Sequence, residues 1–270
     1  MKAKIAVPLM LFSTIVAAEE YRSFSTVDYS HSETDFLELD QFSLTSTWFF
    51  DDKATLGPLK EFEYINRTSN VFGRYSRFDS GGNFYRAAVG GEYFAGNWLL
   101  GGSYDDGDGP RLLTGTVGYL FSEDFLLSVD AVKLGNLDTD LVLDARYNHR
   151  LGGNDYIGFN LRVDDDFDSR EIASKYFTRL AGDTWLAVGL AYNFIEGAED
   201  PWSVTGDYYF SERTSVALGV GKHDRYSLGL SHFFNRNVAL ELGYSTMEVD
   251  VPGSSSLDED VYRAGVTIQF

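Results

Sequence analysis

Apolar and polar residues alternate along short segments throughout most of the chain. In residues 42–50, Phe42, Leu44, Trp48 and Phe50 share one parity, and small polar residues occupy most of the other. A period of two predicts a β-strand with one apolar and one polar face. The other clear segments of this kind are 113–121, 156–163, 185–194, 226–234 and 238–244.

The connectors between these segments are of two kinds, which alternate along the chain. One kind is short and rich in turn-forming residues, and its members are 95–97, 122–124, 152–155, 181–184, 211–214 and 235–237. The other kind is mostly acidic, and its members are 105–110, 164–169, 196–201 and 252–260. The hairpin at 222–225 departs from the acidic rule. This alternation predicts an antiparallel up-and-down sheet with different connectors at its two ends.

Counting the segments predicts about sixteen strands, with a range of roughly 14 to 18. The count is least defined between Tyr21 and Phe84, where residues 51–59 form a longer connector. No linker or shift in composition divides the rest of the chain, so we predict one domain.

The last ten residues form the clearest strand. Tyr262, Ala264, Val266, Ile268 and Phe270 make its apolar face, and the strand ends on an aromatic residue. It resembles the closing strand of bacterial outer-membrane β-barrels. The resemblance implies that Tyr262, Val266, Ile268 and Phe270 form the signal read by the barrel-assembly machinery. It also places the short connectors in the periplasm and the acidic connectors outside the cell.

The amino terminus has the features of an export signal. Lys2 and Lys4 precede an apolar run over residues 5–16, and small residues at 16–18 form a cleavage site. The run is too short to span a bilayer as a helix. We therefore predict a signal peptide over residues 1–18 and an outer-membrane β-barrel over residues 19–270.

Composition supports an all-β transmembrane barrel. Aromatic residues make up 16% of the chain, and 27 glycines accompany only 5 prolines, which suits many strands joined by tight turns. The absence of cysteine excludes disulfides and thiolate metal sites. A net charge of −19 argues against a nucleic-acid partner. We expect no metal and no cofactor.

A soluble β-sandwich or propeller is the structural alternative, because its strands would also alternate. Three features count against it, namely the terminal phenylalanine, the acidity of one set of connectors, and the aromatic residues at segment ends. Such aromatic residues form the girdles of membrane barrels, and they are Trp48, Phe50, Tyr93, Trp98, Tyr119, Phe121, Trp185, Trp202, Phe210 and Phe234.

The charged parity of the strands must face the lumen, because an Arg or Lys on the lipid face costs about 2–4 kcal/mol at the bilayer midplane. The predicted pore-lining residues are Arg86, Glu92, Asp144, Arg146, Arg162, Glu241 and Arg263. We expect the arginines to oppose Glu92, Asp144 and Glu241 across the lumen. The alternative role for these residues is ion pairing that stiffens the wall.

The predicted architecture as a whole resembles the general bacterial porins. The resemblance implies passive diffusion of small hydrophilic solutes or ions across the outer membrane, contact with lipopolysaccharide, and a homotrimer. One feature departs from that family, because the third outer loop is only residues 105–110 and is too short to fold into the barrel. We therefore expect lumen side chains or flattening of the barrel to form the constriction.

Two other functions fit a barrel of this kind. The first is a non-channel scaffold with a structural, adhesive or ligand-binding role. The second is an outer-membrane hydrolase, for which the adjacent His223 and Asp224 are the candidate pair. Neighbouring residues on a strand point to opposite faces, and the chain carries no other catalytic motif, so we predict no enzymatic activity and no catalytic residue.

Overall fold

The structure is a computed structural model that describes residues 20–197, 200–249 and 257–270. The predicted signal peptide at residues 1–18 lies outside these ranges, as do parts of the acidic connectors 196–201 and 252–260. The strands are β1 (Glu20–Glu33), β2 (Glu38–Ala54), β3 (Asn70–Asp79), β4 (Asn83–Ala95), β5 (Trp98–Gly107), β6 (Leu112–Ser122), β7 (Phe125–Leu134), β8 (Thr139–Gly152), β9 (Asp155–Asp164), β10 (Ser169–Arg179), β11 (Trp185–Ile195), β12 (Trp202–Ser211), β13 (Thr214–Gly221), β14 (Arg225–Phe233), β15 (Val238–Val249) and β16 (Leu257–Gln269).

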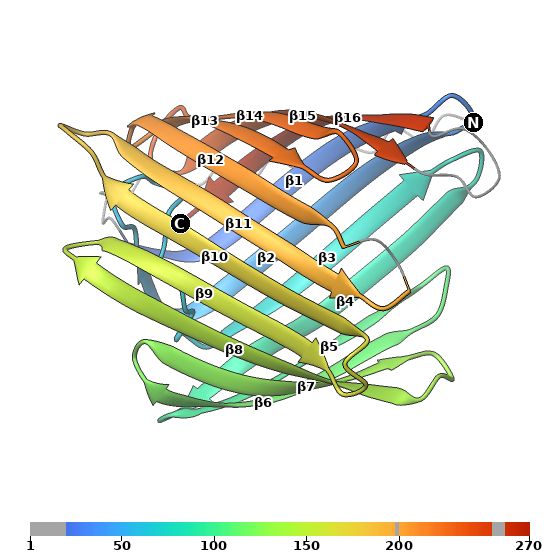
Figure 1. The fold of residues 1–270 in the computed structure, drawn as a ribbon, viewed down its shortest axis with the longest axis horizontal. Coiled ribbons are helices and arrows are strands. Elements are labelled where there is room, and N and C mark those ends of the chain that lie inside the picture. Colours follow the sequence, from blue (N-terminus) through green and yellow to red (C-terminus); the bar gives the residue numbers. More distant parts are fainter. Residues whose placement is uncertain (1–19, 198–199, 250–256) are drawn as a thin grey trace.

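These sixteen strands form one closed antiparallel barrel (Figure 1). Each strand pairs with its neighbours in sequence, and β1 pairs with β16 to close the sheet, with Val27 opposite Val266. The predicted fold class is therefore confirmed. No helix within the described ranges has the length and apolarity that a membrane crossing requires. We call the end where β1 begins and β16 ends the terminal end, and the opposite end the loop end.

The apolar parity of the strands faces outward, as predicted. Leu44, Val117 and Leu190 are between 42% and 52% exposed, which is unusual for such side chains unless lipid covers them. Outward aromatic residues gather near both ends of the strands, as in the girdles of membrane barrels. Those nearer the terminal end include Trp48, Phe50, Trp98, Phe121, Phe210 and Phe234, and those nearer the loop end include Tyr29, Tyr104, Tyr192, Trp202 and Tyr226.

Most connectors at the terminal end are short. They are residues 96–97, 123–124, 153–154, 180–184, 212–213 and 234–237. The connector between β2 and β3 is the exception, because it runs from residue 55 to residue 69. A longer connector was predicted in this part of the chain, and the structure has one. Its predicted position at residues 51–59 is wrong, because β2 continues to Ala54.

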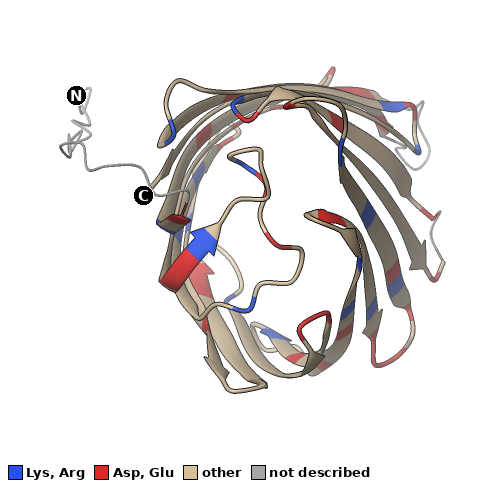
Figure 2. Ribbon diagram, turned by 90° about the vertical axis from the view of Figure 1, so that its left-hand side faces the viewer, with Lys and Arg blue, Asp and Glu red and all other residues tan. Residues whose placement is uncertain are grey.

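Residues 55–69 fold into the barrel rather than away from it (Figure 2). We call this segment the plug. It carries Leu56, Leu59, Phe62, Tyr64 and Ile65, and burying an apolar side chain of this size is worth about 1.5–3 kcal/mol. A projecting loop would leave all five in water, whereas the lumen offers walls to pack against. The expectation that lumen side chains or barrel flattening form the constriction is therefore corrected, because an inserted segment occupies the lumen.

Candidate pore and its plug

The largest apolar contact of the plug is with the wall formed by β9 to β12. Leu56 and Tyr64 of the plug pack against a buried cluster of inward-facing side chains. The members of the cluster are Tyr156, Phe177, Trp185, Ala187 and Tyr209. Trp185 is only 4% exposed, so its predicted place in an outward aromatic girdle is wrong. Its indole instead supports the plug from inside the barrel.

The plug also contacts the other sides of the lumen. Ile65 belongs to a buried cluster with leucines of β5, β6 and β7, and Leu59 packs against Phe233 of β14 and Ala239 of β15. The ring of Phe62 lies 5.1 Å from that of Phe24 on β1, edge to face. Walls on every side of the terminal end therefore hold the plug in place.

Two glycines allow the plug to approach the wall closely. Gly57 has a φ of +135°, and a Cβ at this position would lie 2.7–2.8 Å from the Trp185 indole. Gly158 faces the lumen from β9, and a Cβ there would overlap the ring of Tyr64. Each aromatic ring thus occupies the space that a side chain would fill.

Charged groups tie the middle of the plug to the wall. The carboxylate of Glu61 lies 2.7 Å from the ammonium of Lys175 on β10, and it also accepts a hydrogen bond from the Tyr209 hydroxyl. Next to it in sequence, Lys60 lies 3.1 Å from Asp207 on β12. Glu61 is buried, and a buried carboxylate is stable only when it is paired and hydrogen-bonded in this way.

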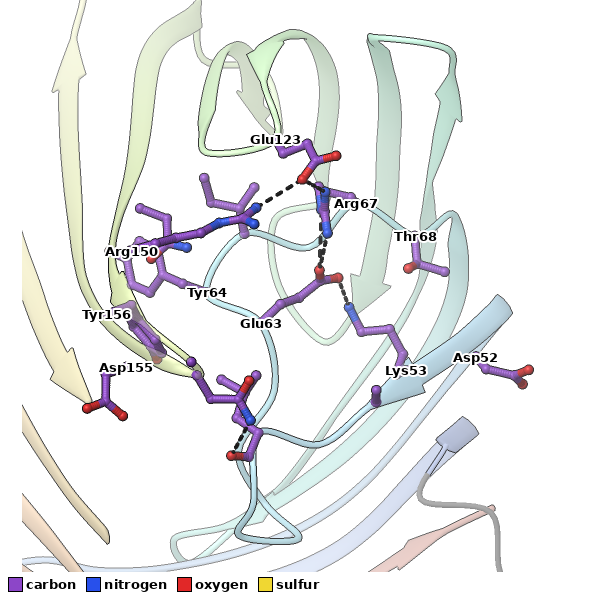
Figure 3. A pocket seen from close by; sticks show the side chains of 16 residues that line it. Asp52, Lys53, Glu63, Tyr64, Arg67, Thr68, Glu123, Arg150, Asp155 and Tyr156 are labelled. Carbon is purple, nitrogen blue, oxygen red and sulfur yellow. Dashed lines mark hydrogen bonds and ion pairs between the residues drawn. The ribbon is translucent and has the colours of Figure 1, made fainter. Parts of the chain in front are cut away.

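A second set of polar contacts holds the segment where the plug returns to β3 (Figure 3). Glu63 accepts hydrogen bonds from Lys53 and, at 3.1 Å, from Arg67. Asn66 donates a hydrogen bond of 3.0 Å to Glu92 on β4. Lys53, Glu63 and Arg67 border a cavity of about 420 Å³ that lies between the plug and the β8–β9 hairpin.

The pH dependence of these contacts follows from Glu63. Burial raises the pKa of its carboxyl, but the hydrogen bond and charge of Lys53, helped by Arg67, outweigh burial, so the pKa lies below its usual value. A lowered pKa adds stability that is complete above the ordinary glutamate pKa of about 4.3 and is lost as the pH falls through the lowered value.

We therefore expect single-channel conductance to stay constant from neutral pH to about pH 4.3 and to rise below it, as the plug loosens. Conductance measured across a pH series in a planar bilayer tests this, with Glu63→Gln as the comparison. Glu63→Gln lacks the ion pairs at every pH, so its conductance should already be raised at neutral pH. A wild-type conductance that falls on acidification would contradict the expectation.

The structure places all seven predicted pore-lining residues on the inward parity of their strands. Three arginines have acidic partners, in pairs formed by Arg86 with Asp105 at 2.6 Å, Arg263 with Asp28 at 2.7 Å, and Arg146 with Asp144 at 2.8 Å. Arg162 lies 3.8 Å from both Asp130 and Asp144.

The predicted opposition of these arginines to Glu92, Asp144 and Glu241 holds only for Asp144. Glu92 instead accepts hydrogen bonds from the amides of Asn66 and Asn70. Arg74, which sequence reasoning missed, faces the lumen from β3 and lines a cavity of about 340 Å³ with Asp28, Arg86 and Asp105. The sequence feature that could have identified Arg74 is its position between Phe72 and Ser76, on the same parity of β3 as Ser76.

Residues 5–270 match the profile of a family described as "putative general bacterial porin". The chain belongs to this family. No relative among the curated proteins matches this porin.

Several solved structures share the fold of this porin. The outer membrane protein Omp33 of Acinetobacter baumannii is similar with a TM-score of 0.57 and 14% identity, over 93% of this chain and 99% of Omp33. OpdQ of Pseudomonas aeruginosa is similar with a TM-score of 0.52 and 9% identity, over 94% of this chain and 100% of OpdQ. OccK7 of the same bacterium has a TM-score of 0.54 at 9% identity, over 93% of this chain and 99% of OccK7.

The family and the fold together assign a porin-like diffusion channel of the outer membrane. The members of this porin family are channel proteins rather than enzymes. His223 and Asp224, the suggested catalytic pair, lie in the β13–β14 turn with positive φ values of 59° and 46°. Such angles are typical of a tight hairpin turn, where Asn, Asp and His are favoured.

Proposed function

We propose that small hydrophilic solutes and ions diffuse passively through this porin and that the plug sets its constriction. The observation that carries the proposal is the position of residues 55–69 inside the lumen, in contact with β5 to β7, β9 to β12, and β14 and β15. A barrel of this strand number otherwise encloses a wide aqueous channel. Passage must therefore follow whatever space the plug and the wall leave between them.

The proposed orientation puts the terminal end in the periplasm. Both ends of the barrel domain lie there, and the connectors at this end, apart from the plug, are short, as in other outer-membrane barrels. The acidic connectors then face the outside, next to lipopolysaccharide. In this orientation the plug enters the lumen from the periplasmic side, unlike an inward-folded outer loop.

We extend the proposal to the assembly machinery and the oligomeric state of this porin. Tyr262 and Val266 face outward on β16 and Phe270 is exposed directly after it, where the barrel-assembly machinery would read them after export with a cleaved signal peptide. The predicted homotrimer is a further part of it, and light scattering of the detergent-solubilised protein would measure the oligomeric mass.

Single-channel current of the refolded barrel in a planar bilayer tests the channel function. We expect stable ohmic steps that are small for a barrel of this size, because the plug occupies the terminal end. The control is the shift in electrophoretic mobility on heating, which shows that the barrel is folded. A folded barrel that inserts and passes no current would overturn the proposal in favour of the non-channel scaffold.

A further inference from the structure

Most charges in the lumen are neutralised by a partner. Arg263 contacts Asp28 through both Nε, at 3.0 Å, and Nη2, at 2.7 Å, and the arginines of β4, β8 and β9 lie against acidic residues in the same way. The charges of the plug are paired as well, through Lys175 and Asp207. Paired charges of opposite sign impose little preference on a passing ion, since their fields largely cancel.

Glu241 differs from these residues. It faces the lumen from β15, and it forms neither an ion pair nor a hydrogen bond within the described ranges. Its direct neighbours across the sheet are Ser231 on β14 and Gly265 on β16, which offer no charge. Arg263 is the nearest basic residue on the adjacent strand, and its guanidinium is bound to Asp28.

Apart from Phe233 on the side of the plug and Arg263 on β16, the inward side chains around Glu241 are small. From β12 to β16, the inward positions away from the terminal end are mostly small and uncharged. The small, uncharged residues among them are Ser203, Thr205, Ala217, Gly219, Ser227, Gly229, Ser231, Gly243, Ser245 and Gly265, and the charged ones are Asp207, Arg225 and Arg263. The Glu241 carboxylate is therefore half-exposed and open to water and ions in the lumen.

Glu241 also lies next to the constriction. The preceding inward residue on β15 is Ala239, which is fully buried against Leu59 of the plug. One step along the inward face of a strand spans about 7 Å. A solute on its way to the plug along this wall must therefore pass close to the free carboxylate.

We propose that Glu241 selects cations at the lumen-side entrance to the constriction, so that small cationic solutes and metal cations are preferred over anions. This inference rests on the proposed diffusion function. Among the described residues, Arg74 is one basic side chain without a partner, but it lies on β3 and lines a cavity that it shares with Asp28 and Asp105. The acidic residues at the loop end act in the same direction as Glu241, since they concentrate cations at the opposite mouth.

The test is the reversal potential in a KCl gradient, from which the K⁺ to Cl⁻ permeability ratio follows. We expect a ratio above one for the wild type and a fall of about 16-fold in Glu241→Gln, because removing a charge roughly 5 Å away in a water-like medium changes the partition of K⁺ and of Cl⁻ about fourfold each, in opposite directions. Glu241→Asp should keep the wild-type preference. Arg74→Gln should raise the ratio, because it removes the opposing charge.

Two further variants separate selectivity from a structural effect. The double variant Arg86→Gln/Asp105→Asn removes a matched pair and should leave the ratio unchanged. Gly243→Lys adds a positive charge at the next inward position of β15, where a Cβ meets only ordinary contacts, and should lower the ratio because the ammonium can neutralise Glu241 without removing it.

The failures of the two proposals can be told apart. Current through Glu241→Gln with the wild-type permeability ratio would overturn the role of Glu241 and leave the channel function standing. A wild type that prefers anions would do the same. A folded wild-type barrel that inserts without passing current would overturn both proposals.

Discussion

A barrel without its plug is expected to conduct several times more current than the wild type. The natural way to remove the plug is to replace residues 51–68 by Asn-Gly, a pair that favours the tight turn between antiparallel strands. The residues on either side of this deletion already meet, because Phe50 N–H donates to the Ser69 carbonyl at 2.9 Å. The barrel wall can therefore close without the segment.

The expected gain follows from what the plug fills. Its five apolar residues occupy the lumen against all sides of the terminal end. Single-channel conductance of the two proteins in the same bilayer and salt measures the effect. Equal conductance, with the barrel shown to be folded by its heat-induced mobility shift, would mean that the constriction lies elsewhere.

The same variant should unfold at a lower temperature than the wild type. Removing the plug exposes Phe177, Trp185 and Tyr209 to lumen water, although each is at most 4% exposed in its presence. Burial of side chains of this size is worth about 1.5–3 kcal/mol each. The temperature at which the mobility shift occurs reports this loss independently of the current.

The strands could be predicted from the sequence because the membrane constrains them so strongly. Lipid outside and water inside force residues such as Leu190 and Gly189 onto opposite faces, and every strand repeats that choice. The turns add a second regularity at the terminal end. Barrel closure then follows from the closing strand, which pairs with β1.

The plug could not be predicted by the same reasoning. Its apolar residues do not alternate, as Tyr64 and Ile65 show, and their partners are inward-facing aromatic residues on distant strands. Trp185 shows why the partners were missed, since an aromatic residue at a strand end fits an outward girdle equally well from sequence. The available signal was an unusually apolar connector at the end where other connectors have a few polar residues.

The ion-pair partners of the charged lumen residues could also be identified only from the structure. Arg263 and Asp28 are separated by 235 residues and meet only because β16 pairs with β1 in one particular register. The parity of a charged residue follows from alternation, but its neighbour depends on how the strands are staggered around the barrel. Glu241 was thus predicted to face the lumen, whereas its lack of a partner became visible only in three dimensions.

Replacing Gly158 by alanine is expected to displace the Tyr64 ring and to loosen the packing of the plug. A methyl group at this position would overlap the tyrosine ring, and forcing extra volume into a packed site typically costs about 1–3 kcal/mol. We expect a lower unfolding temperature and a larger conductance at neutral pH. Gly243→Ala is the matched control, because Gly243 also faces the lumen but its Cβ would lie 3.6 Å from the nearest atom, the Arg263 Cβ.

A double variant identifies the cause of the effect. In Gly158→Ala/Tyr64→Ala the overlapping ring is gone, so Gly158→Ala should cost much less stability in this background than in the wild type, and the costs of the two changes should not add. Additive losses of stability would show that alanine disturbs β9 itself rather than the packing of the Tyr64 ring. Conductance separates the same two causes, because a disturbed β9 leaves the plug in place, whereas a displaced Tyr64 opens the lumen at the point where the plug crosses it.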